Sequence, residues 1–153
     1  ARYFQQRSGL ATVADDSGLE VDALEGAPGV RSKRFAADGG QHGPELEGQA
    51  RDDANNRWLV RRLEGVPEEE RTARYVCVAV LPEGEGREMV TRAEAPGRIV
   101  DEPRGAGGFG YDPHFYDPEL DRTFAEISDE EKNARSHRGR AFRALAARLR
   151  EER

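Results

Sequence analysis

The sequence has 153 residues, of which 35% are charged and 36% hydrophobic, which suits one domain with a buried core and a strongly charged surface. Its net charge of −6 argues against duplex DNA or RNA as a partner, because an acidic surface repels a phosphate backbone. No apolar run approaches the roughly 20 residues that cross a bilayer, so we expect neither nucleic acid nor a membrane among its partners.

The chain opens with the pattern of a helix end. Residues 1–8 read as the tail of a helix, and Gly9 stands where helices commonly end in a left-handed conformation. Because so short a helix is not stable alone, we expect the first elements of the domain to precede Ala1. We therefore interpret residues 1–153 as a single domain without its first elements.

Two strands, a turn and a short helix are expected next. The first strand is almost entirely apolar, which indicates burial, and it runs straight into Asp15 and Asp16. The second alternates apolar and acidic residues, as is typical of a half-exposed strand, and a Pro/Gly turn follows it. These elements are the strands 10–14 and 19–24, the turn 26–29 and the helix 32–37.

A longer helix and an antiparallel hairpin form the middle of the sequence. The apolar face of helix 49–63 consists of Ala50, Ala54, Trp58, Leu59 and Leu63. Residues 73–81 are the clearest strand, and the single cysteine, Cys77, lies in this apolar run, which indicates a buried core residue. A hairpin turn at 82–87 then leads into one or two strands over 88–100.

The last part contains a glycine-rich loop, a short strand and a final helix. They span residues 105–113, 123–127 and the stretch after Ser136, which caps the helix. The inward stripe of this helix consists of Phe142, Leu145, Ala146 and Leu149. This order of strands and helices predicts an α/β fold, with a mixed β-sheet flanked by helices rather than a doubly wound parallel sheet.

The first motif with chemical potential is acidic. Asp15, Asp16, Ser17 and Gly18 follow the end of a strand, where open α/β sheets bind their ligands. Magnesium takes one or two carboxylates together with phosphates and water, so Asp15 and Asp16 are candidate Mg²⁺ ligands. Neighbouring side chains on a strand point in opposite directions, so we expect only one of them to face the metal. A plain polar turn is the alternative interpretation.

The second motif is the glycine-rich loop, which contains Phe109, Gly110, Tyr111 and Asp112. Glycine allows the backbone to approach a ligand closely. Phe109 and Tyr111 offer flat faces to a purine, and Asp112 can accept hydrogen bonds from a base or ribose. The alternative is a surface loop with an aromatic plug.

The third motif is a cluster of Lys132, His137 and Arg138 around the start of the final helix. A helix N-terminus favours anions and carbonyl oxygens. Arg138 supplies a rigid fork of donors, Lys132 a point charge, and His137 a donor for a base carbonyl. The alternative is a capped helix with exposed charges.

Together these motifs resemble the inosine triphosphate pyrophosphatase family, which hydrolyses non-standard purine nucleoside triphosphates. The matching segments occur in family order at residues 14–18, 26–30, 55–56, 103–105, 107–113, 124–126, 132 and 136–139. The resemblance implies an elongated α/β structure with a cleft between two lobes, a cytoplasmic location and a homodimer. It also implies a first strand and a triphosphate-binding loop, followed by a further glutamate ligand, all before Ala1.

The resemblance further implies a role for each motif. Asp16 would be the catalytic residue and a magnesium ligand, and Ser17 would touch the substrate. Residues 109–112 would line the nucleotide pocket, and Lys132, His137 and Arg138 would bind base or phosphate. The implied reaction is Mg²⁺-dependent conversion of ITP, dITP or XTP to a monophosphate and pyrophosphate, which cleanses the nucleotide pool.

Three other functions stay open on the sequence alone. The chain can be a catalytically inactive nucleotide-binding module. It can be a fragment that pairs with a partner or another copy to complete its sheet. It can also be a hydrolase of another nucleotide, such as a modified pyrimidine triphosphate.

Overall fold

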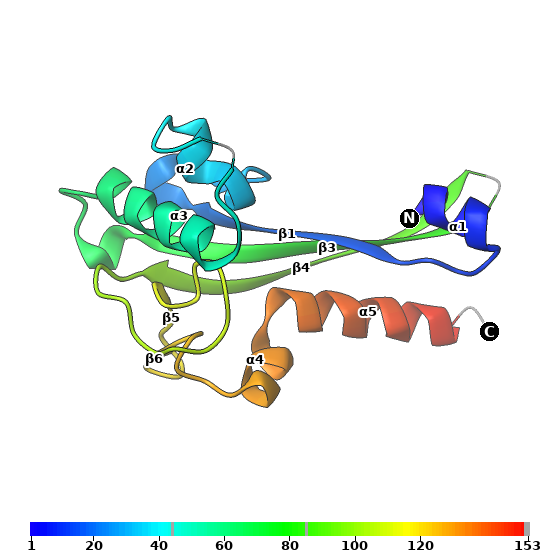
Figure 1. Ribbon diagram of the computed structural model, residues 1–153. Helices are drawn as coiled ribbons and strands as arrows, with labels where there is room; N and C mark the ends of the chain where they lie inside the picture. Colours follow the sequence, from blue (N-terminus) through cyan, green and yellow to red (C-terminus); the bar gives the residue numbers. More distant parts are fainter. Residues whose placement is uncertain (44, 85, 152–153) are drawn as a thin grey trace.

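The fold is built on a six-stranded β-sheet with helices packed around it (Figure 1). The computed structural model describes residues 1–43, 45–84 and 86–151. The strands are β1 (Ala14–Val21), β2 (Pro28–Gly29), β3 (Thr72–Gly84), β4 (Arg87–Ile99), β5 (Phe115–Asp117) and β6 (Arg122–Thr123). Their order is β2-β1-β3-β4-β5-β6, and every pairing between the described strands is antiparallel.

The helices lie at the two ends of the long strands and, in the case of the last helix, along β3 and β4. They are α1 (Arg2–Ser8), α2 (Phe35–Asp38), α3 (Gly48–Arg62), α4 (Asp129–Arg135) and α5 (His137–Glu151). Figure 1 shows α2 and α3 beside one end of β1, β3 and β4, and α1 beside the other end. The molecule is therefore elongated, with β1, β3 and β4 running between its two ends.

Much of the expected α/β architecture is confirmed. Helix α1 ends at Gly9, which has a φ of 70° as a left-handed cap. Helix α3 and the β3–β4 hairpin lie where the hydrophobic patterns place them. Along β3, burial alternates residue by residue, and Cys77 is fully buried. The parallel pairings that a mixed sheet would contain are not among those of the described strands.

The expected strand at residues 10–14 is wrong. The regular strand begins only at Ala14, because its pairing with β3 starts there, opposite Val80. Leu10 and Val13 are 69% and 38% exposed, so this segment is not buried. As a result Asp15 and Asp16 lie inside β1 rather than after a strand end, and the strand runs on through Val21, which absorbs part of the expected strand 19–24.

Smaller differences concern boundaries and helix faces. Strand β3 continues to Gly84, three residues into the expected turn 82–87, and Glu85 of that turn lies outside the described residues. The expected strand 123–127 is reduced to β6, since residues 124–127 form turns. Ala50 and Ala146 are exposed, and Leu149 is only half-buried, so these three do not belong to the inward faces of their helices.

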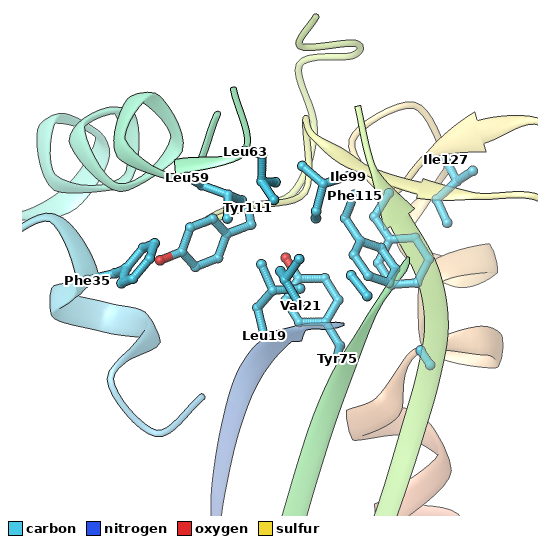
Figure 2. Close-up of a cluster of buried hydrophobic side chains, with 13 residues drawn as sticks. Leu19, Val21, Phe35, Leu59, Leu63, Tyr75, Ile99, Tyr111, Phe115 and Ile127 are labelled. Carbon is cyan, nitrogen blue, oxygen red and sulfur yellow. The ribbon is translucent and has the colours of Figure 1, made fainter. Parts of the chain in front are cut away.

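Two apolar clusters hold these elements together. The larger one joins β1, β3 and β4 to α2, α3 and the loop before β5, and Figure 2 shows Tyr75, Tyr111 and Phe115 within it. The smaller one packs Ala141 and Leu145 of α5 against Cys77, Ala79 and Met89. Helix α4, which precedes α5, begins with a capping box between Ser128 and Glu131. Within the described ranges, no helix is long and apolar enough to cross a membrane.

Candidate active site

Asp15 and Asp16 point away from each other because they are neighbours on β1. Asp15 forms an ion pair with the Arg138 guanidinium on α5, with Oδ2 at 3.0 Å from Nε, and its Oδ1 accepts a hydrogen bond from Nη2 at 3.2 Å. Its other neighbour is the Cys77 thiol, whose pKa is raised by burial. Asp15 is thus committed to an ion pair, and Ser17 lies on the same side of the strand.

Asp16 instead lines a pocket of about 680 Å³, here called the Asp16 pocket. Three cationic side chains, Lys33, Arg34 and Arg51, line it as well, together with the carboxylates of Asp38 and Glu47. The Nε of Arg51 and the Nε2 of His42, another lining residue, are buried and have no hydrogen-bond partner among the described residues. The Nε–H of Arg51 and the cationic side chains are suited to an anionic ligand.

Asp112 is the centre of a second group, here called the Asp112 cluster: Tyr75, Phe109, Asp112, Lys132 and His137. The Asp112 carboxylate is 2% exposed and accepts three hydrogen bonds. The Tyr75 hydroxyl donates to Oδ1 at 3.1 Å, while the Phe109 backbone N–H donates to Oδ2 at 2.8 Å. Lys132 forms an ion pair with the same Oδ2. A buried carboxylate needs such partners, and here all of them are donors to its charged form.

Lys132 also lies over the ring of Phe109, with Nζ at 4.5 Å from the ring centroid. This placement is a cation–π contact, which attracts the ammonium to the ring face. Phe109 is 72% exposed, so most of its ring is free to contact another flat group. The aromatic face expected on this loop is therefore supplied by Phe109 with a positive charge beside it.

His137 is the first residue of α5, directly after Ser136, whose hydroxyl accepts a hydrogen bond from the Gly139 N–H and so caps the helix. Its imidazole stacks on Tyr75, with ring centroids 4.8 Å apart and planes 15° apart. Burial, together with the charges of Lys132 and Arg138, lowers the pKa of His137 to about 4. The imidazole is therefore neutral near pH 7, with one nitrogen as donor and one as acceptor.

The conformation of the loop 105–113 depends on glycine and on partners from α3. Gly108 has a φ of 69°, and a Cβ there would lie 2.2 Å from Oδ2 of Asp112. The N–H of Gly110 donates to Asp52, and Asn56 donates to the Gly110 carbonyl, both at 2.9 Å. The loop is thus tied to α3 and closed around Asp112.

Tyr111 differs from its expected role. Its ring is 5% exposed and packs in the large cluster, and its hydroxyl donates to the Ser32 carbonyl at 2.7 Å. Figure 2 shows the ring between the α3 side chains and Phe35. Because the ring is buried in the core, Tyr111 has no flat face free for a ligand, and the exposed aromatic ring of this loop is that of Phe109.

The residues present fit a magnesium ion only in part. Asp16 is an exposed carboxylate beside a pocket with room for phosphates, which suits a metal that keeps phosphate and water ligands. Asp15 does not fit the same ion, because Arg138 occupies its carboxylate on the other side of β1. Across the described residues, no group of three His, Cys, Asp or Glu side chains is close enough to hold a metal.

Several residues at these sites were not expected from the sequence. Tyr75 lies in an apolar strand, where an aromatic residue is ordinarily part of the hydrophobic core, so its sequence context gives no sign of a site residue. Lys33, Arg34 and Arg51 carried no motif of their own, and Asp52 supports the loop from a helix surface. Only Asn56 had a signal, because residues 55–56 matched the family in order.

These sites define a protein that handles a flat, anionic ligand such as a nucleotide. The Ham1 family model matches residues 1–148, and the chain belongs to this family. The family assignment made from the motifs is confirmed.

Curated relatives support the same assignment. A protein of Frankia alni named dITP/XTP pyrophosphatase is 50% identical over 151 residues, covering 99% of this chain and 72% of the relative. One of the same name from Desulforamulus reducens is 50% identical over 137 residues, covering 89% and 63%. The chain thus spans between about three fifths and three quarters of the length of these relatives.

Solved structures match the fold closely. The Ham1 protein of Staphylococcus aureus is 37% identical with a TM-score of 0.82, covering 97% of this chain and 71% of that one. A nucleoside-triphosphatase / dITP/XTP pyrophosphatase from Mycobacterium abscessus is 46% identical with a TM-score of 0.73, covering 95% and 69%. The α/β fold class is confirmed by these matches.

Proposed function

We propose that this chain is a dITP/XTP pyrophosphatase, a hydrolase that converts ITP, dITP and XTP to the monophosphate and pyrophosphate and so cleanses the nucleotide pool. The observation that carries the proposal is the 50% identity with a dITP/XTP pyrophosphatase over 99% of this chain. The Asp112 cluster and the Asp16 pocket add the chemistry that such a substrate needs: a flat exposed ring, base-edge donors and cationic groups for phosphates.

The proposed reaction is attack of water on the α-phosphorus. A bond forms between the water oxygen and this phosphorus, and the bond to the oxygen that bridges the α- and β-phosphorus breaks, which releases pyrophosphate. Asp16 orients the water and accepts its proton. Mg²⁺, when bound at Asp16, supplies positive charge that offsets the phosphate oxygens. Lys33, Arg34 and Arg51 line the pocket on the same side as Asp16 and stabilise negative charge there.

Base recognition is assigned to the other side of β1. Phe109 stacks on the purine, and His137 and Arg138 donate hydrogen bonds to its 6-oxo group. Adenine carries an amino group at that position, which leaves these donors without an acceptor and disfavours ATP. Lys132 forms an ion pair with Asp112 and places a positive charge over the Phe109 ring on which the base stacks.

A cytoplasmic location and a homodimer belong to the same proposal, since both are implied by the family resemblance. Size-exclusion chromatography with light scattering at several protein concentrations tests the dimer. A mass of one chain at all concentrations would contradict it.

The direct test is release of pyrophosphate from ITP, XTP, GTP and ATP with magnesium, for the parent and for Asp16→Asn. Faster release from ITP and XTP than from ATP, lost in the variant, supports the proposal. No release from any of the four, by a protein whose circular dichroism shows a folded α/β domain, contradicts it.

One observation favours a second candidate, a nucleotide-binding module without turnover. In the described part of the chain, the Asp16 pocket has no converging group of three metal-binding side chains. Saturable binding of ITP by calorimetry, without pyrophosphate release, would select this candidate.

A further inference from the structure

Tyr75 lies directly beneath the residues to which base recognition was assigned, although it was given no role. It stands on β3 and is 8% exposed. Its hydroxyl donates to Asp112 at 3.1 Å, and its ring stacks on His137 at 4.8 Å. One side chain therefore contacts two residues from different segments, the glycine-rich loop and the start of α5.

The hydroxyl of Tyr75 stays a donor under all ordinary conditions. Burial and the adjacent Asp112 carboxylate raise the pKa of Tyr75 well above its usual range, so the phenol keeps its proton. Because it binds Oδ1, the other oxygen of Asp112 is left to the Phe109 N–H and to Lys132. Because each oxygen of Asp112 has its own donors, the orientation of the carboxylate is fixed, and with it the position of the loop.

The ring of Tyr75 is itself held firmly. Its centroid lies 4.4 Å from that of Phe115 and 5.9 Å from that of Phe124, on the side of the core. Figure 2 shows Tyr75 and Phe115 side by side within the large cluster. Since Phe115 and Phe124 are 0% and 1% exposed, the surface on which His137 rests has little freedom to move.

We propose that Tyr75 is a positioning residue for base recognition, which fixes Asp112 through its hydroxyl and His137 through its ring. The proposal rests on the proposed function, because it assumes that the Asp112 cluster receives the base. Tyr75 joins the loop 105–113 to the start of α5, so that the exposed ring of Phe109 and the imidazole of His137 keep a constant separation.

The test separates the two contacts with two variants. Tyr75→Phe keeps the ring and removes the hydroxyl, and Tyr75→Leu removes both. We expect the KM for ITP to rise about tenfold in Tyr75→Phe with kcat within about threefold, because a hydrogen bond to a charged group is lost in ground state and transition state alike. We expect a further rise of about tenfold in Tyr75→Leu, since His137 also loses its stacking partner.

Tyr116→Phe is the matched control. Tyr116 is also 8% exposed, and its hydroxyl also donates to a carboxylate, that of Asp121, away from the Asp112 cluster. The control is expected to leave the KM for ITP unchanged. If Tyr75→Phe and Tyr116→Phe give the same KM as the parent, the proposal is overturned, and the Tyr75 hydroxyl contributes to the core alone.

A second measurement does not depend on turnover. In proton NMR spectra, the His137 ring signals, identified by their loss in His137→Gln, are expected to keep their upfield position in Tyr75→Phe and to move downfield in Tyr75→Leu. Unchanged signals in Tyr75→Leu would overturn the stacking role. A parent that neither binds nor hydrolyses ITP would overturn the proposed function, whereas an active parent with an unaltered Tyr75→Phe overturns only the inference about Tyr75.

Discussion

The two sides of β1 differ in how far their polar groups are already paired. On the side of Asp15, the carboxylate binds Arg138, and Asp112 has three donors. On the side of Asp16, Arg51 pairs with Asp52, but none of the ion pairs between described residues involves Asp16, Lys33 or Arg34. Under the proposed function, the groups for base recognition are therefore preformed, whereas Asp16, Lys33 and Arg34 are left for a ligand to pair with.

This difference follows from what each half of a nucleotide requires. A base is neutral and flat, so selection among bases needs donors held at fixed positions before binding. A triphosphate carries several negative charges, so cations without partners of their own can bind it strongly. Asp15 and Asp16 are neighbours on β1 and point to opposite sides of it. The strand thereby separates the proposed base site from the proposed phosphate site.

The largest effect is expected at Asp16. Asp16→Asn keeps the shape of the side chain but removes its charge and its capacity to accept a proton, so turnover of ITP should fall at least about 100-fold. The KM for ITP and the melting temperature should change little. Steady-state kinetics and thermal melts check this.

Asp53→Asn serves as the control for Asp16→Asn, because Asp53 lies on the α3 surface at another pocket. It should behave like the parent. An Asp16→Asn variant that retains activity within a few-fold would remove Asp16 from the chemistry and leave the two sides of β1 without the proposed division of labour.

The next effect concerns acid stability on the paired side. His137 has a folded-state pKa of about 4, below its ordinary value of 6.5, so the folded state resists its protonation. The contribution of the neutral imidazole to the free energy of unfolding is complete above pH 6.5. It is lost as the pH falls from 6.5 to 4, by up to about 3 kcal/mol. Urea unfolding of the parent and of His137→Gln between pH 4 and pH 8 measures it. The same slope in both proteins would contradict the buried, neutral imidazole.

Sequence patterns predicted the side of Asp15 better than the side of Asp16. Phe109, Asp112, Lys132, His137 and Arg138 were expected near one another, since their motifs sit in a glycine loop and at a helix start. The structure joins Phe109, Asp112, Lys132 and His137 in one cluster, with Arg138 next to His137.

The residues that were missed or misplaced depend on long-range packing. Tyr75 looked like a core residue, and it is one, yet its hydroxyl meets a loop 37 positions away in the sequence. Lys33, from the segment just before α2, and Arg51, from α3, line the same pocket as Asp16, which no local pattern encodes. Tyr111 was misplaced because an aromatic in a loop can face either the ligand or the core, and here its hydroxyl finds the Ser32 carbonyl.

Gly108 tests whether the loop tolerates any change around Asp112. Gly108→Ala forces a side chain into a left-handed conformation and toward the Asp112 carboxylate, so it should cost about 2 kcal/mol of unfolding free energy and raise the KM for ITP. Gly65→Ala is the control, because Gly65 has a φ of 84° but no atom within 4 Å of the added Cβ. A cost of about 1 kcal/mol is expected there, with no change in KM. Equal effects at both positions would mean that the contact with Asp112 does not matter.

The smallest effect, a loss of base selection, is expected at Arg138. This residue binds Asp15 and is also assigned to the 6-oxo group, so Arg138→Ala should reduce the preference for ITP over ATP about tenfold in kcat/KM, which corresponds to about 1.4 kcal/mol. Arg140→Ala removes an arginine of the same helix, one that donates to the Glu94 carbonyl, and it should keep the preference of the parent. If Arg138→Ala keeps it too, Arg138 serves only to hold α5 against β1. Base selection would then belong to His137 and the Asp112 cluster alone.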